Sequence, residues 1–178
     1  MTFREVYNEH FRFVWRTLRA LGVQERDAPD AVQDVFLVVH RKLPEFEARA
    51  KLTTWLFSIC YRVASDRRRL AHVRRELPDH ETLEARVDEG ASPAQQAERR
   101  QEFALLERAL GALPEEQRAV FILFEINDTP CEEIAETLGT PLGTVYSRLR
   151  LGREAFRRAL ARLQAQRAPT ALRLREAP

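Results

Sequence analysis

The sequence predicts an all-α protein of two small helical domains joined by a flexible acidic linker, the second domain containing a helix-turn-helix. Apolar residues recur at three- and four-residue spacing in every periodic segment, and no segment alternates as a half-buried strand does. This spacing fades between residues 77 and 91, where a proline, a glycine and five acidic residues occur. The predicted divisions are domain one at residues 1–76, the linker at 77–91, domain two at 92–167 and a disordered tail at 168–178.

Domain one is predicted to contain three helices. Thr2 and Glu5 form a capping box at the start of the first helix. Asp27 and Asp30 are capping residues for the second helix, and Pro29 suits its first turn. The predicted helices run from Thr2 to Gly22, from Asp27 to Pro44 and from Thr53 to Ala71.

Domain two is predicted to contain four helices, and the last two lie within residues 131–163. The first two span residues 92–111 and 115–126. In the last pair, Ala135, Gly139 and Val145 stand at i, i+4 and i+10. A small residue lets two helices cross closely, glycine permits positive φ, and a β-branched residue packs the second helix on the first. This is helix-turn-helix spacing, and the second helix of that motif usually enters a DNA major groove.

The composition excludes several classes of protein. No apolar run approaches the length that spans a bilayer, and the amino terminus lacks an apolar signal segment, so we expect a cytoplasmic protein without membrane insertion. Two cysteines, Cys60 and Cys131, are too few for a disulfide framework and are expected to be buried. The four histidines lack metal-ligand spacing, and no nucleophile stands with a base. We therefore expect no metal, no cofactor and no catalytic site.

Charge is distributed unevenly along the chain, although the net charge is only +2. Residues 1–76 carry a net +5, residues 77–111 carry −4 and residues 112–178 carry +1. Arginines nevertheless dominate residues 148–167. Two basic regions separated by an acidic one suit a protein that contacts nucleic acid at two places.

The last predicted helix carries the first candidate DNA surface. The residues opposite its apolar stripe are polar or basic, as expected where side chains contact base edges and phosphates. Ser147 and Arg150 are the candidates for base contacts, with Thr144 and Tyr146 beside them. Phosphate contacts are assigned to Arg148, Arg153 and Arg157.

The third predicted helix carries a second candidate surface. Trp55, Ser58, Arg62, Ser65 and Arg69 form one stripe beside its apolar face. An aromatic ring and arginines along one edge suit stacking on unpaired bases and binding of their backbone. The alternative left open by the residues alone is that Trp55 belongs to the core and the arginines only face solvent.

The second predicted helix carries acidic and amide groups opposite its apolar stripe. Asp30, Gln33 and Asp34 are poor ligands for DNA and suit a basic or helical protein partner.

These segments together resemble an extracytoplasmic-function (ECF) RNA polymerase sigma factor of the sigma-70 family. The resemblance rests on residues 27–46 (DAPDAVQDVFLVVHRKLPEF), residues 52–69 (LTTWLFSICYRVASDRRR) and the helix-turn-helix region 113–156. It implies a non-enzymatic subunit that binds core RNA polymerase through the β′ clamp helices and the β flap. This subunit would direct the polymerase to promoter DNA in a stress or envelope response. An anti-sigma factor would hold it inactive.

The resemblance also implies roles for individual residues. Those matching the β′-binding positions are Asp30, Gln33, Asp34 and Phe36. Those matching the −10-element segment are Lys51, Trp55, Ser58, Arg62, Ser65 and Arg69, with the loop 45–52 capturing a flipped base. The helix-turn-helix residues would contact the −35 element. Arg62 replaces a common Asn and Leu151 a common Arg, so base preference is expected to differ at both places.

The length of the linker bears on the arrangement of the domains. A coil of this length averages roughly 22 Å between its ends and reaches at most roughly 50–58 Å. We therefore expect the domains to be mobile or differently packed in the free protein and to be pulled apart on polymerase. The alternative functions are a stand-alone helix-turn-helix regulator and, less consistent with the residues, a small helical nuclease.

Overall fold

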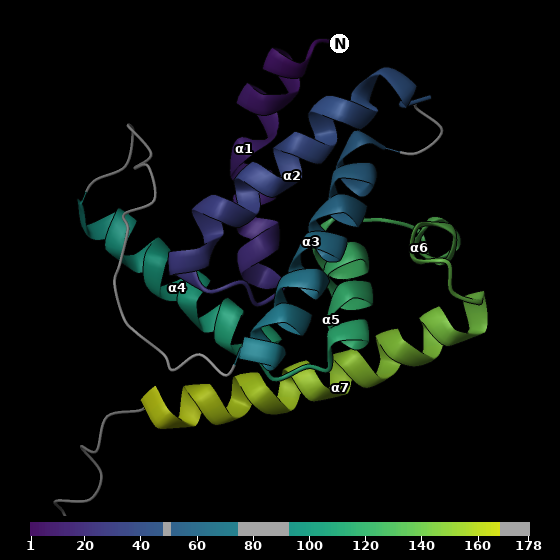
Figure 1. Ribbon diagram of the computed structural model, residues 1–178. Helices are drawn as coiled ribbons and strands as arrows, with labels where there is room; N and C mark the ends of the chain where they lie inside the picture. The colour runs from purple at the N-terminus through teal and green to yellow at the C-terminus, as the bar shows by residue number, and fades with distance from the viewer. Residues whose placement is uncertain (48–50, 75–92, 168–178) are drawn as a thin grey trace, which may run out of the picture.

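The computed structural model describes residues 1–47, 51–74 and 93–167, and these residues form helices without any strand (Figure 1). The predicted acidic linker and the predicted disordered tail lie outside the described residues. Within the described part, no helix has both the length and the low charge needed to cross a bilayer. The elements are α1 Phe3–Ala20, η1 Glu25–Asp27, α2 Ala28–Lys42, η2 Leu43–Glu45, α3 Leu52–Arg74, α4 Pro93–Gly111, α5 Glu115–Phe121, η3 Ile122–Ile126, α6 Cys131–Leu138 and α7 Leu142–Arg167.

The capping box at the start of α1 is confirmed, whereas the predicted cap of α2 is wrong. The Thr2 backbone N–H donates to Glu5 Oε2 at 2.7 Å, and the Glu5 N–H donates to Thr2 Oγ1 at 3.3 Å. Asp27 makes no capping hydrogen bond with its side chain. It ends the 3₁₀ turn η1 with φ −93° and ψ −10°, so its backbone lacks the extended conformation that a capping side chain needs.

The first domain is formed by α1, α2 and α3, which pack together in the upper part of Figure 1. Its core contains fully buried side chains from all three helices, including Val14, Leu18, Val35, Leu56 and Phe57. The thiol of Cys60 is also completely buried, as the sequence predicted.

The second domain is formed by α4 to α7, with α7 running along α4 and α5 (Figure 1). Gly152 permits this approach, because a Cβ there would lie 3.2 Å from the backbone oxygen of Gln117. The predicted helix 115–126 is not uniform: α5 continues as the π-helical segment η3, which ends with Asn127 N–H donating to the Ile122 oxygen at 3.1 Å. This wider turn leads into the loop before α6.

Candidate nucleic-acid and protein interfaces

The turn between α6 and α7 has helix-turn-helix geometry. Gly139 adopts φ +61° and ψ +38°, the left-handed conformation that glycine accepts without strain. The Thr140 N–H then donates to the Ala135 oxygen at 2.9 Å and closes the end of α6. The helices α6 and α7 contact each other, and Val145 is fully buried, as its predicted packing role requires. Ile134 of α6 is fully buried as well.

The predicted −35 residues all lie on α7, between positions 144 and 157. Tyr146 is 52% exposed, Ser147, Arg150 and Arg157 are also exposed, and Thr144 is half-buried. The Ser147 hydroxyl donates to the Gly143 backbone oxygen at 2.9 Å. Because the opposite stripe is buried, these side chains form the outer face of the helix.

Three of the predicted DNA-binding arginines are paired with carboxylates. Arg148 binds Glu116, Arg150 binds Glu154 at 2.9 Å, and Arg153 binds Glu125 at 2.5 Å. Arg153 also lies over the ring of Phe124, 5.1 Å from its centroid. The helical spacing of Arg150 and Glu154 is visible in the sequence, but Glu116 and Glu125 come from other elements and were missed. Partly exposed pairs of this kind contribute little stability.

The predicted −10 stripe lies on α3 and is partly covered. Trp55 is half-buried, and its ring lies against that of Phe46 with centroids 5.0 Å apart. Arg62 is exposed, and Arg69 is exposed beside Asp66, 3.1 Å away. The other members are exposed Lys51 and the half-buried Ser58 and Ser65. The tryptophan is therefore neither a core residue nor a free one, but a partly accessible ring at the loop.

The predicted polymerase-binding residues on α2 separate into two groups. Asp30, Gln33 and Asp34 are exposed, and Asp34 accepts hydrogen bonds from Arg67 on α3 at 2.5 and 3.1 Å. Phe36 is only 4% exposed and belongs to the core. The structure thus places the polar residues, but not Phe36, on the surface of α2.

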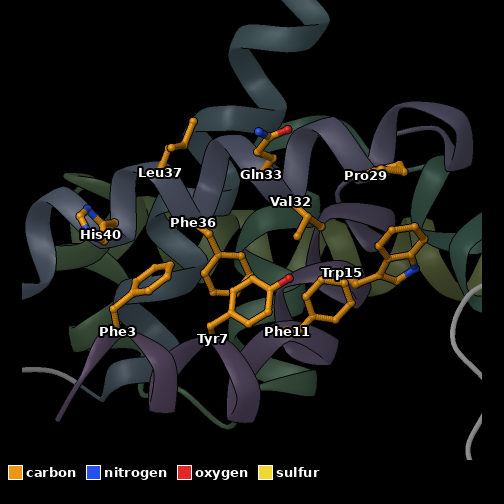
Figure 2. A pocket seen from close by; sticks show the side chains of 10 residues that line it. All are labelled: Phe3, Tyr7, Phe11, Trp15, Pro29, Val32, Gln33, Phe36, Leu37 and His40. Carbon is orange, nitrogen blue, oxygen red and sulfur yellow. The ribbon is translucent and has the colours of Figure 1, made fainter.

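An apolar groove of 620 Å³ separates α1 from α2 (Figure 2). Phe3, Tyr7 and Phe11 project into it from α1, and Phe36 meets them from α2. The centroids of Tyr7 and Phe36 are 4.6 Å apart. No groove was predicted here, although aromatic residues recur every four positions along α1.

An ion pair joins the two domains. The guanidinium of Arg19 on α1 donates two hydrogen bonds to the Glu107 carboxylate on α4, both at 2.8 Å. Burial raises the pKa of Glu107, and the attraction of Arg19 offsets this only in part. Burial thus makes the ionised form of the Glu107 carboxylate less favourable. The ion pair therefore contributes little net stability to the contact between the domains.

A second contact between the domains centres on the Leu21 carbonyl. This oxygen accepts hydrogen bonds from Arg68 of domain one and Arg118 of domain two, both at 2.9 Å. Arg68 also pairs with Glu115 at the start of α5. Gly22, next in the chain, has φ +95°, and a Cβ there would lie 2.5 Å from the Arg118 guanidinium. The turn after α1 is therefore a docking point for domain two.

Domain two also covers one side of α3. The helix α6 lies beside α3 in Figure 1 and contacts it. Tyr61 of α3 has a raised pKa, chiefly through burial, with Glu115 and Glu116 of domain two adding to the effect. Ser58 and Ser65 lie on this side of α3, three residues before and four residues after Tyr61. Part of the predicted −10 surface therefore faces domain two.

Two family models match the chain in the order of its domains. Residues 6–74 match Sigma-70 region 2, and residues 103–156 match Sigma-70, region 4. The first match covers nearly all of α1 to α3, and the second begins within α4 and covers α5, η3 and the helix-turn-helix.

Individual relatives agree with the family models. The chain is 34% identical over 170 residues to the ECF RNA polymerase sigma factor SigE of Mycolicibacterium smegmatis, covering 94% of this chain and 65% of that protein. It is 32% identical over 161 residues to the ECF RNA polymerase sigma factor RpoE of Cereibacter sphaeroides, covering 89% of this chain and 86% of the relative.

Solved structures share the fold. A structure of CnrH in complex with the cytosolic domain of CnrY matches with a TM-score of 0.60 and 23% identity, covering 93% of this chain and 89% of the other. A co-crystal structure of the sigma factor RpoE with the anti-sigma factor NepR from Bartonella quintana also gives 0.60 and 23%, covering 87% and 96%. The two family models, in the order of the two domains, and the relatives at 30% identity or more show that the chain belongs to the ECF RNA polymerase sigma factors of the sigma-70 family.

Proposed function

We propose that this chain binds core RNA polymerase and directs it to promoters with two elements, without catalysing a reaction itself. The observation that carries the proposal is one chain with three surfaces of different chemistry. These are the exposed acidic and amide face of α2, the aromatic and basic edge of α3, and the outer face of α7. A stand-alone regulator would need only the last of them.

The α2 surface is proposed to dock on the polymerase. Asp30 and Gln33 are exposed, and Asp30 forms no ion pair within the described residues. Asp34 forms an ion pair with Arg67. Phe36 is assigned a supporting role, because its ring fixes α2 against α1 from within the core. Leu37, 54% exposed, adds an apolar contact beside Gln33.

The α3 and α7 surfaces are proposed to contact the two promoter elements. Trp55 is assigned to stacking on an unpaired base of the −10 element, with Arg62 and Arg69 on its backbone. The residues of α7 are assigned to the −35 element, where the duplex stays paired. The loop before α3 would hold a flipped base, and domain boundaries near residues 76 and 92 would let the two surfaces separate.

The proposal is tested by transcription with purified core polymerase on promoters mapped from transcript starts. Core alone should be inactive at these starts, and the chain should restore specific initiation. The Gln33→Lys variant tests the α2 face separately: it places a charge there without touching either DNA surface, so it should lower initiation and leave DNA binding unchanged. A chain that leaves core inert but binds the same DNA alone would instead be a regulator.

An anti-sigma protein is the proposed regulatory partner. Both solved neighbours are complexes with a second protein, and in one of them a sigma factor is bound by an anti-sigma factor. The groove between α1 and α2 gives such a protein an apolar surface next to the proposed polymerase site. A pull-down from the source organism should recover a protein that competes with core for the chain.

The free protein is proposed to be closed, with domain two resting on α3, and to open on polymerase. In the closed form, domain two partly covers the proposed −10 surface. The two DNA surfaces can therefore bind together only after the domains separate. The contact between the domains includes few ion pairs, and burial disfavours the ionised form of Glu107 in one of them. Because such ion pairs stabilise the contact little, contacts with polymerase can replace it.

Reversing either charge of the Arg19–Glu107 pair is expected to open the free protein. The Arg19→Glu and Glu107→Arg variants each place like charges together and should raise the radius of gyration measured by X-ray scattering. The double variant restores the pair, but the carboxylate introduced at position 19 would then also face Glu25, whose own carboxylate lies 3.9 Å from Arg19 in the native protein. It should therefore return most, but not all, of the compactness. An equal radius for all four proteins would contradict the closed form.

A further inference from the structure

Large apolar side chains are exposed on the part of α7 that is proposed to face DNA. Among the described residues, eight large apolar side chains are exposed, and three of them lie in the first ten residues of α7: Leu142, Tyr146 and Leu151. Leu151 is 39% exposed and Tyr146 is 52% exposed. Single exposed apolar residues are common on protein surfaces, but three on the same short stretch of one helix require a reason.

Helical spacing places these residues beside the proposed base contacts. Residues four apart lie next to each other on one helix face, so Tyr146 adjoins Arg150 and Leu151 adjoins Ser147. Ser147 donates its hydroxyl hydrogen to the Gly143 oxygen. The hydroxyl oxygen of Ser147 then remains available as an acceptor for a DNA base in the major groove. The outer face of α7 thus offers an acceptor and an apolar group in neighbouring positions.

The charged donors on the same stretch are partly occupied. Arg148, Arg150 and Arg153 are each paired with a carboxylate. The pair of Arg150 with Glu154 lies on the outer face of α7. A bidentate contact from Arg150 to guanine would first have to break that pair. Further along the helix, exposed Arg157 and Arg158 make no ion pair within the described residues and are available for phosphates.

We infer that α7 recognises A·T pairs in the −35 element, with Leu151 packing on a thymine 5-methyl group. In the major groove, thymine presents a methyl group and adenine an N6 donor. Leu151 complements the methyl, and the Ser147 oxygen complements the adenine donor. Because this inference rests on the proposed function, its test must separate the two.

The test replaces each thymine of the mapped −35 element, one at a time, by deoxyuridine. This change removes only the methyl group and keeps the base pairing and the O4 acceptor. With holoenzyme assembled from core and the full chain, we expect about a fourfold loss of affinity at one thymine at least, the effect of one methyl-sized group. Holoenzyme with the Leu151→Ala variant should bind the thymine probe and the deoxyuridine probe for that position with equal affinity. Leu151→Met should keep the difference.

The outcomes distinguish the inference from the proposed function. If holoenzyme still initiates at the promoter but deoxyuridine has no effect at any thymine, or the element lacks A·T pairs, the inference is overturned and the function stands. A Leu151→Ala protein that retains the full deoxyuridine effect overturns the assignment to Leu151. If the chain gives no specific initiation with core, the function itself fails.

Discussion

Replacing Phe36 by alanine is expected to lower the free energy of unfolding by about 3–5 kcal/mol, the usual cost of removing a buried phenylalanine. The ring is 4% exposed and meets three aromatic neighbours, with centroids 4.6 Å from Tyr7, 6.3 Å from Phe3 and 6.4 Å from Phe11. Alanine would leave these rings without a partner and enlarge the groove between α1 and α2. Urea denaturation followed by circular dichroism measures the loss.

The neighbouring Leu37→Ala variant is the control for this prediction. Leu37 is 54% exposed, so its truncation should change the free energy of unfolding by no more than about 0.5 kcal/mol. It should instead weaken binding to core polymerase, because Leu37 lies on the outer face of α2. If Phe36→Ala unfolds no more easily than Leu37→Ala, the aromatic cluster does not stabilise domain one as described.

Helix positions could be predicted because local spacing determines them. The Thr2 capping box depends on residues three apart, and the turn at Gly139 depends on residues within one helical turn of it. The wrong cap at Asp27 shows the limit of this reasoning. A preferred residue type cannot reveal that the backbone has already entered a 3₁₀ turn at that position.

Contacts between the domains could not be predicted from local patterns. Arg19 and Glu107 are separated by 88 positions, and Arg118 meets Leu21 across 97 positions. Nothing in the spacing of either arginine distinguishes it from one that faces solvent. The covered side of α3 was missed for the same reason. The linker argument predicted only that the free domains would be mobile or differently packed, and this stays a prediction.

The candidate site was predicted as a set of surfaces rather than as a set of contacts. All of the expected α7 residues lie on that helix, but the carboxylates that hold Arg148 and Arg153 come from α5 and η3. The sequence indicated which helix is proposed to face DNA. It did not indicate which arginines would have to exchange partners first, and this depends on the tertiary packing of domain two.

Replacing Arg118 by alanine is expected to lower the stability of domain two by about 3–5 kcal/mol, which lies between the cost of one and of three hydrogen bonds to a charged group. The guanidinium, 8% exposed, donates to the oxygens of Gly111 at 3.1 Å, Leu113 at 2.9 Å and Leu21 at 2.9 Å. Burial lowers the pKa of Arg118, so removing the charge recovers part of its desolvation cost and the full sum is not lost.

Arg68→Ala is the matched control, because both arginines donate to the same carbonyl. After Arg118 is removed, the Leu21 oxygen still has Arg68, whereas the Gly111 and Leu113 oxygens within domain two have no donor among the hydrogen bonds of the structure. After Arg68 is removed, every one of the three oxygens keeps Arg118. Thermal unfolding should therefore show a large loss for Arg118→Ala, confined to the transition of domain two, and a loss of at most about 1 kcal/mol for the half-exposed Arg68→Ala. Equal losses would mean that Arg118 acts through the contact between the domains rather than by joining the end of α4 to the start of α5.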